Sequence, residues 1–339
     1  MDYQQMRDEI TSLCKAQLDR YPMAQPVDIL KVLYQGEFGP GHLISDVAKS
    51  REFLELEYAE MQAGPDECIE PIGFGFCRLH LNAMDKPGVS METFFRIFEL
   101  SAMSHYGSQE GFAQKVAILK ELLAEVPDNA VLFRHSEVFR EAYRPAYRVV
   151  KEEYCRHLAL LAKIDVALNE NRPIIVAIDG DAASGKTTLA CRLHLIYNCN
   201  VIHMDHFFLT PGQRTPRRLA EPGGNVDHER FNKEVLMPLV AQRTFAYRPF
   251  DCQTWDFGNE ITIAPNRLTI VEGCYSHHPA LTDAYDVKVF LDVNHDEQMR
   301  RIILRNSPEM VEKFRDIWIP MEKKYFSAFD IEQKADLVF

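Results

Sequence analysis

The sequence lacks the marks of several protein classes. None of its apolar runs approaches the roughly 18–20 residues that span a bilayer, so we expect no membrane segment. The first residues, MDYQQMRDEITSLCK, hold neither the basic nor the apolar stretch of a signal peptide. No internal repeat or low-complexity tract interrupts the 339 residues, a length that accommodates two ordinary domains.

Paired cysteines and excess positive charge are also missing. The eight cysteines are scattered without a C-x-x-C motif, which favours free thiols and predicts a cytoplasmic protein. No spacing typical of a zinc site occurs. The formal net charge of −12 argues against a nucleic-acid partner bound through a basic surface. A homo-oligomer remains open.

One stretch carries an explicit signal, PIIVAIDGDAASGKTT at 173–188. Its apolar, β-branched start is typical of a buried parallel strand. The G-x-x-x-x-G-K-T that follows matches the phosphate-binding loop pattern at every fixed position, and residues 188–193 continue as an amphipathic helix. The strand, loop and helix together predict a site for a nucleoside triphosphate.

The chemistry of this loop follows from its residue types. Gly180 and Gly185 permit backbone angles that a Cβ would forbid, so consecutive N–H groups can point at phosphate oxygens. We expect Lys186 to reach the β- and γ-phosphates and the Thr187 hydroxyl to ligate Mg²⁺. The predicted nucleotide-binding residues are Gly180, Asp181, Ala183, Ser184, Gly185, Lys186, Thr187 and Thr188.

Two further apolar runs, 200–205 and 268–273, end in carboxylates. Ligands of open α/β sheets bind beyond the carboxyl ends of the strands, so Asp205 and Glu272 are expected near the phosphates. Asp205 is either the base that accepts a proton from an acceptor hydroxyl or a helix cap; we favour the base. Glu272 is predicted to hold Mg²⁺ directly or through water.

The long loop 210–227 is rich in Gly, Pro and Arg, which indicates a functional or disordered segment. Its arginines 214, 217 and 218 either meet an anionic group or are solvated. Asp227 either caps the next helix or binds substrate hydroxyls, with His228 beside it. A small hairpin predicted over 245–264 carries Trp255, which is either a pocket wall or a core anchor.

The C-terminal segment contains arginines beside a helix break. Helix 296–305 carries Arg300, Arg301 and Arg305, and Asn-Ser-Pro-Glu at 306–309 ends it. Such arginines suit a mobile lid that closes on phosphates; the alternative is a solvated helix face.

Residues 170–339 resemble the uridine kinase/phosphoribulokinase family of P-loop kinases. The matching pieces are GDAASGKTT at 180–188, MDHFF at 204–208, NVDH at 225–228, VEG at 271–273 and the arginines of 300–305. The resemblance implies an α/β fold, a P-loop NTPase parallel sheet with flanking helices, with ATP and Mg²⁺ as cofactors and a small-molecule hydroxyl acceptor. It also implies Asp205 and Lys186 as catalytic, Glu272 near the metal, Asp227 near the acceptor, and Arg301 and Arg305 in the lid.

The chain departs from that family in two places. Uridine kinases carry a tyrosine, an Asp-Phe pair, a histidine and an arginine where the hairpin meets the nucleoside. This chain has PFDCQTW at 249–255, with Trp255 where the histidine would fall. Their lid carries Arg-Gly-Arg, whereas this chain has Ser-Pro at 307–308. Because buried polar contacts enforce discrimination, these departures weaken the case for uridine and leave phosphoryl transfer intact.

Residues 1–165 show no family resemblance and are predicted to form a mostly α-helical domain, followed by a P-loop kinase domain at 166–339. Helices are expected over 2–20, 93–103, 111–126 and 136–164, among others, with a strand within 71–81. Two polar clusters are notable: loop 37–42 with Arg78 and His80, and segment 134–148. They form either a second polar site or a tight turn with surface histidines and snorkelling arginines.

Three interpretations of the whole chain remain open at this point. The first is a kinase for a small molecule. The second is a nucleotide-dependent regulatory ATPase whose output domain is the N-terminal half. The third is a bifunctional protein, for which His42, Arg78 and His135 are the first candidate residues.

Overall fold

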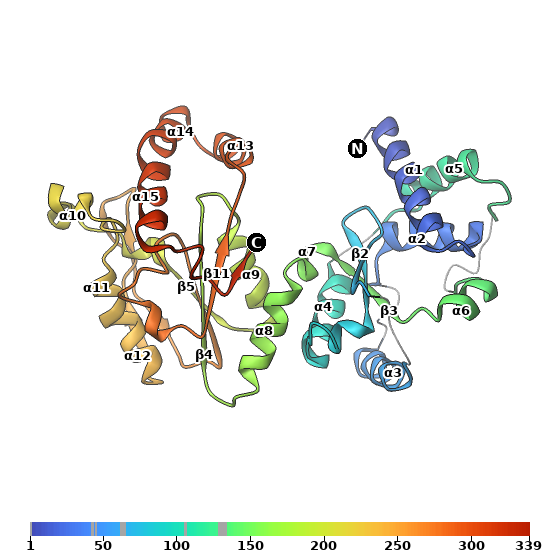
Figure 1. The fold of residues 1–339 in the computed structure, drawn as a ribbon, viewed down its shortest axis with the longest axis horizontal. Helices are drawn as coiled ribbons and strands as arrows, with labels where there is room; N and C mark the ends of the chain where they lie inside the picture. The colour runs from blue at the N-terminus through green and yellow to red at the C-terminus, as the bar shows by residue number, and fades with distance from the viewer. Residues whose placement is uncertain (1, 42–43, 45, 62–65, 105–106, 128–133) are drawn as a thin grey trace. The chain divides into compact units, whose positions relative to one another are not determined.

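The computed structural model describes residues 2–41, 44, 46–61, 66–104, 107–127 and 134–339. The chain divides into two compact units, residues 1–165 and 166–339 (Figure 1). His42 lies outside the described residues. No helix in the described ranges is long and apolar enough to cross a membrane.

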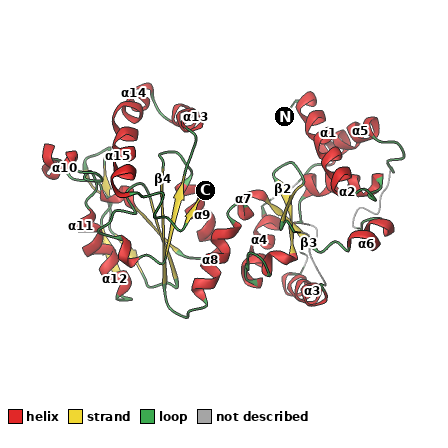
Figure 2. Cartoon of the chain, in the orientation of Figure 1, coloured by secondary structure: helices red, strands yellow, loops and turns green. Residues whose placement is uncertain are grey.

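The N-terminal unit combines helices with a three-stranded antiparallel sheet in the order β1-β2-β3. Its strands are β1 (Ile69–Pro71), β2 (Phe76–His80) and β3 (Tyr147–Lys151). Its helices are α1 (Tyr3–Arg20), α2 (Pro26–Phe38), α3 (Val47–Glu60), α4 (Met91–Met103), α5 (Gln109–Leu122), α6 (Glu137–Tyr143), α7 (Glu152–Cys155) and α8 (Leu158–Leu168), the last of which crosses the division between the units. The mostly helical prediction is confirmed (Figure 2).

Strand alternation decides what each face of this small sheet meets. Phe76 of β2 and Val149 of β3 pack against α1, α2 and α5 in one apolar core. Because successive strand residues point to opposite faces, Arg78 and His80 lie on the same side as Phe76. On this face of the sheet, the apolar core around Phe76 is therefore followed directly by the buried polar side chains of Arg78 and His80.

The helical prediction over 136–164 is wrong in part. Arg144 ends α6 in the left-handed conformation (φ 43°), and Pro145 cannot continue the helix. The β-branched pair Val149 and Val150 then pairs with β2 as β3. The predicted strand within 71–81 is confirmed as β2.

The C-terminal unit is built on a five-stranded parallel sheet in the order β12-β11-β4-β10-β5. Its strands are β4 (Ile174–Gly180), β5 (Asn200–His203), β10 (Leu268–Glu272), β11 (Val287–Leu291) and β12 (Leu337–Val338). Its helices are α9 (Lys186–Tyr197), α10 (Pro216–Ala220), α11 (His228–Phe231), α12 (Met237–Val240), α13 (His295–Arg305), α14 (Pro308–Lys313) and α15 (Ile319–Phe329). The predicted parallel sheet with flanking helices is confirmed (Figures 1 and 2).

The predicted hairpin is also confirmed, and it encloses a second pair of strands. β6 (Phe245–Tyr247) pairs with β9 (Ile261–Ile263), and β7 (Phe250–Asp251) pairs with β8 (Asp256–Phe257).

Strand register aligns the polar ends of the parallel sheet. β4 is buried along its whole length at the centre. Glu272, the last residue of β10, is paired with Ile178 of β4 on one side and with His203 of β5 on the other. The phosphate loop after β4 and the acidic segment after β5 therefore flank Glu272 at one edge of the sheet.

Candidate functional site

The backbone of the phosphate loop depends on its two fixed glycines. Gly180 (φ 135°) and Gly185 (φ 108°) both adopt left-handed-region angles. A Cβ at position 180 would lie 2.1 Å from the Leu291 carbonyl oxygen of β11, so no larger residue fits. Gly185 directly precedes α9, whose first-turn N–H groups are therefore available to an anion.

Lys186 lies across this loop. Its Nζ donates hydrogen bonds to the carbonyl oxygens of Gly180 at 2.8 Å and of Asp181 at 2.7 Å. The side-chain oxygen of Ser184 is shielded from solvent and has no hydrogen-bond partner in the described ranges. The Lys186 ammonium lies against the loop backbone, and the Ser184 hydroxyl is free to bond to a ligand. Both features suit a loop that binds the phosphates of a nucleotide.

Thr187, Glu272 and His203 form a polar group beside the loop. The Thr187 hydroxyl donates to the Glu272 carboxylate, with oxygen separations of 3.1 and 3.2 Å. His203 Nδ1 is hydrogen-bonded to the same carboxylate, and this bond raises the pKa of His203 although burial opposes the rise. Hydroxyl and carboxylate oxygens suit Mg²⁺.

A metal ion at this place would depend on the nucleotide. Among the described residues, no three His, Cys, Asp or Glu side chains form a ready metal site. Thr187 and Glu272 would therefore share Mg²⁺ with phosphate oxygens and water, which is how this ion is commonly held.

Asp205 follows β5 inside a short 3₁₀ helix whose N-cap is His203, so it is not the cap residue itself. Gly273 allows the end of β10 to approach, because a Cβ there would lie 2.9 Å from Met204 Cβ. The Asp205 side chain is open to solvent on one side and crowded by protein on the others. This crowding raises the pKa of Asp205, while the charge of Lys186 opposes the rise.

The two predicted lid arginines lie near the loop and near the base. Arg301 Nη1 donates to the carbonyl oxygens of Ala183 (3.0 Å) and Ser184 (3.4 Å) in the phosphate loop. The charge of Arg305 lowers the pKa of Asp205. Both Arg300 and Arg301 pair with Glu297 of α13, and in the described ranges Arg300 makes no hydrogen bond or ion pair with the loop.

Sequence reasoning missed a residue behind the loop. Glu322 of α15 accepts a hydrogen bond from the loop N–H of Ala182 at 3.1 Å. Burial raises the pKa of Glu322 to about 7, and the charge of Lys186 opposes this rise. No local pattern marks Glu322, because it lies 140 residues from its partner in sequence.

Asp227 and His228 are held by their surroundings. The Asp227 carboxylate caps α11 by accepting from Arg230 N at 2.9 Å, and it also accepts from Gln213 Nε2 at 2.6 Å. His228 stacks on His278, with ring centroids 4.1 Å apart, and burial lowers its pKa. The helix-cap alternative for Asp227 therefore describes its contacts in this structure.

The loop arginines have different environments. Arg218 donates to the carbonyl oxygens of Gly224 and Val226 and pairs with Glu229, so it fastens the loop to itself. Arg214 lies 5.5 Å from the ring of Trp255, which is 49% exposed.

The hairpin turn and the base border the same space. Burial raises the pKa of Cys252, and the charges of both Arg214 and Asp205 also act on it. Trp255 takes a left-handed φ of 57° in the same turn and keeps an exposed ring there.

The polar residues singled out in the N-terminal unit have other partners than the sequence suggested. Glu37 pairs with Lys115 of α5 at 2.8 Å rather than with Arg78 or His80. Arg78 is fully buried and pairs with Glu70 at 2.9 Å, and His80 bonds to the same carboxylate. These contacts are those of a buried network, not of a surface turn.

No family model matches the chain. A uridine kinase from Lactiplantibacillus plantarum is 28% identical over 153 residues, which are 41% of this chain and 70% of that protein. A uridine kinase from Macrococcus caseolyticus is 23% identical over 186 residues, 50% of this chain and 88% of that protein. Among solved structures, a "possible uridine kinase" from Bacillus stearothermophilus is 20% identical with a TM-score of 0.39, covering 53% of this chain and 98% of that one.

Both sequence matches cover about half of this chain. The predicted resemblance is therefore confirmed for about half of the chain, which is similar to the uridine kinase and phosphoribulokinase family of P-loop kinases.

Proposed function

We propose that this chain is a kinase that uses ATP and Mg²⁺ to phosphorylate a hydroxyl of a small molecule, nucleoside-like or another small metabolite. One observation carries the proposal: Lys186, the Thr187–Glu272 pair and Asp205 meet at the carboxyl ends of three neighbouring strands, β4, β10 and β5. A phosphate loop alone would support only nucleotide binding. The added carboxylate beyond β5 supports transfer to an acceptor.

The donor side is assigned to the loop and its neighbours. Backbone N–H groups of 180–188 and Lys186 would bind the phosphates, and Thr187 and Glu272 would hold the metal. ATP with Mg²⁺ would supply the phosphoryl group and neutralise charge on it. Arg301 and Arg305 of α13 would add positive charge beside the transferring group.

Asp205 is assigned the role of base. A carboxylate that accepts the hydroxyl proton works best when its pKa lies close to the working pH, and crowding raises the pKa of Asp205 in that direction. Its open side leaves room for an acceptor, and the Trp255 ring with Arg214 offers an aromatic face and a cation there. Asp227 and His228 complete the proposed acceptor side.

The test replaces the base without changing its shape. Asp205→Asn is expected to lower acceptor-dependent ADP release by about 10²–10⁴-fold, while ATP affinity changes by less than about threefold because the loop is untouched. The assay uses a panel of nucleosides, vitamins and sugars as acceptors. Asp283→Asn, an exposed aspartate of the same unit, is the matched control and should leave turnover unchanged. Full turnover in the Asp205 variant would remove the base assignment.

The same panel separates the alternative function. A regulatory ATPase whose output domain is the N-terminal unit would release ADP at one rate with every acceptor. If ATP binding then altered hydrogen exchange in residues 1–165, the regulatory function would replace the kinase proposal.

A further inference from the structure

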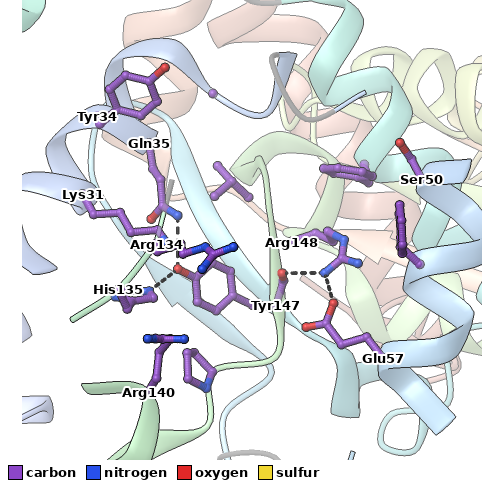
Figure 3. A pocket seen from close by; sticks show the side chains of 15 residues that line it. Lys31, Tyr34, Gln35, Ser50, Glu57, Arg134, His135, Arg140, Tyr147 and Arg148 are labelled. Carbon is purple, nitrogen blue, oxygen red and sulfur yellow. Dashed lines mark hydrogen bonds and ion pairs between the residues drawn. The ribbon is translucent and has the colours of Figure 1, made fainter. Parts of the chain in front are cut away.

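The N-terminal unit contains a cavity of about 650 Å³. Its walls come mainly from α2, α3, α4, α6, β3 and the segment just before α6, so every lining residue belongs to residues 1–165 and none to the phosphate loop (Figure 3). The volume falls within the roughly 300–1,000 Å³ of small-molecule sites. The segment 134–148, a predicted polar cluster, supplies much of this lining.

Positive charge dominates the cavity. Four cationic side chains line it, with one carboxylate, that of Glu57. Of the four lining cations only Arg148 is neutralised by a lining carboxylate, through a hydrogen bond of 2.7 Å to Glu57, which leaves three cations without a counter-charge in the lining. This surplus lies in a chain whose formal net charge is −12. The uncompensated cations are Lys31, Arg134 and Arg140.

These three cations are uncommitted. Lys31 and Arg134 make no hydrogen bond or ion pair with any residue that the structure describes. Arg140 has only a loose pair with exposed Glu137 at 3.9 Å. Lys31 is also half-buried, and burial together with the charge of Arg78 lowers its pKa to about 8. A bound anion would relieve the cost of a cation that has lost water and gained no partner.

The floor of the cavity is polar and preorganised, and it carries one negative charge, that of the Asp28 carboxylate. Against the effect of burial, hydrogen bonds from His135 and Ser136 lower the pKa of Asp28 to about 2. Asp28 accepts from His135 Nδ1 at 3.0 Å, so His135 Nε2 must accept the Tyr147 hydroxyl proton at 2.6 Å. Gln35 Nε2 donates to the Tyr147 oxygen at 3.1 Å. Burial lowers the pKa of His135 to about 4, so its ring is uncharged near pH 7. The Asp28 carboxylate is occupied by hydrogen bonds from His135 and Ser136, so among the described residues it makes no direct ion pair with the three cations, and its single charge leaves them a net surplus of two positive charges.

We propose that this cavity is a second ligand site, specific for a small phosphomonoester with an aromatic or apolar body. Lys31, Arg134 and Arg140 together match a dianion better than a single carboxylate, which would leave one positive charge uncompensated. Arginine forks also fit phosphate oxygens in a bidentate way. The rings of Phe53 and Phe98 line the same cavity and suit the body of the ligand. Figure 3 shows Lys31, Arg134 and Arg140 around Tyr147, with Arg148 held apart by Glu57.

The test titrates phenyl phosphate into the full-length chain by calorimetry, with benzoate and benzyl alcohol as the monoanionic and neutral probes. Phenyl phosphate is expected to bind at least tenfold more tightly than benzoate, and benzyl alcohol is expected not to bind measurably. Equal affinity for phenyl phosphate and benzoate would overturn the dianion assignment.

Two sets of variants locate the binding. The double variant Lys31→Met/Arg134→Gln should weaken phenyl phosphate binding at least tenfold and leave ATP affinity within twofold. Lys186→Met should weaken ATP binding at least tenfold and leave phenyl phosphate affinity within twofold. Lys15→Met/Arg156→Gln, at exposed positions of the same unit outside the cavity, is the matched control. Loss of phenyl phosphate binding in Lys186→Met alone would assign the ligand to the phosphate loop and overturn the proposal.

A charge-preserving variant separates charge from folding. Lys31→Arg keeps the cation and is expected to retain phenyl phosphate binding within about threefold, whereas Lys31→Met loses it. If both variants bind as the unchanged chain does, Lys31 has no part in the site and the proposal fails.

Discussion

The two units arrange charge in opposite ways around their polar sites. The C-terminal unit places carboxylates, Asp205 and Glu272, at the edge of its sheet, where a metal and a nucleotide can meet them. The N-terminal unit places cations, Lys31 and Arg134, beside a hydrogen-bonded floor whose one carboxylate, Asp28, is occupied by His135 and Ser136.

The C-terminal site therefore sets carboxylates beside the cations at its phosphate loop, Lys186 and Arg301, whereas cations outnumber carboxylates in the N-terminal cavity. Both sites lie beside buried hydrogen-bonded groups, the Thr187–Glu272 pair in one unit and the His135–Tyr147 pair in the other.

The scaffolds themselves differ. The C-terminal site rests on backbone conformation, because Gly180 and Gly273 let chain segments pass close to each other. The N-terminal site rests on a side-chain network centred on the buried Arg78–Glu70 pair. A backbone scaffold is sensitive to a single added methyl group, whereas a charge network is sensitive to the loss of one partner.

The largest effect is expected from breaking that charge network. Glu70→Gln leaves Arg78, which is fully buried, without its compensating charge, and should cost the N-terminal unit about 3–5 kcal/mol of unfolding free energy. Hydrogen exchange resolved by residue measures this loss separately for each unit. Glu67→Gln is the control, since Glu67 is a 71% exposed partner of Arg20 and should matter by less than about 1 kcal/mol. Equal protection in both variants would show that the network does not support the unit.

A backbone substitution tests the other scaffold. Gly180→Ala puts a Cβ at 2.1 Å from the Leu291 carbonyl oxygen and should cost the C-terminal unit about 3 kcal/mol, the upper range for overpacking. Both tryptophans, Trp255 and Trp318, lie in residues 166–339, so tryptophan fluorescence in urea reports this unit. Gly212→Ala, where a Cβ meets nothing within 4 Å, is the control. A Gly180 variant that unfolds at the same urea concentration as the control would contradict the tight approach.

The pH dependence of stability should have opposite signs at two buried groups. The pKa of His135 falls from 6.5 to about 4 on folding, so the unfolded chain binds more protons and this group loses stability as pH falls from 6.5 towards 4. The pKa of Glu322 rises from 4.5 to about 7, so the folded chain binds more protons and gains stability as pH falls from 7 towards 4.5. Each effect amounts to roughly 3 kcal/mol when complete.

Matched variants isolate these two contributions. As pH falls from 7 to 5, the stability advantage of the unchanged chain over His135→Gln should shrink, while its advantage over Glu322→Gln should grow. Denaturant unfolding at several pH values measures both differences. Parallel pH slopes for the two variants would show that at least one of these groups titrates normally.

Prediction from sequence succeeded where the structure is local. The strand at 174–178, the two glycines and Lys186 lie within one short segment of the chain. Their spacing alone therefore predicts the conformation of the loop. The placement of Asp205 and Glu272 near the phosphates was a prediction from a general property of parallel sheets, and β-strand order puts the two strand ends side by side. The roles assigned to these residues stay predictions.

Prediction failed where distant segments meet. The expected helix over 136–164 contains β3, because pairing with β2 outweighed the local helical pattern. The cavity draws Lys31, Glu57, Arg134 and Arg148 from four separate segments, and no spacing in the sequence relates them. Glu322 was missed for the same reason.

The sequence by itself therefore determined that the chain has a phosphate loop, with carboxylates after two later strands and a second half of different character. Backbone angles and strand propensity are set by neighbouring residues, and such features can be read locally. Only the tertiary structure decided that Arg301 contacts the loop carbonyls, that Glu322 accepts from the loop N–H of Ala182, and that the N-terminal cations share one cavity. Those contacts arise from packing between elements far apart in the chain, where burial and charge, not sequence neighbours, select the partner.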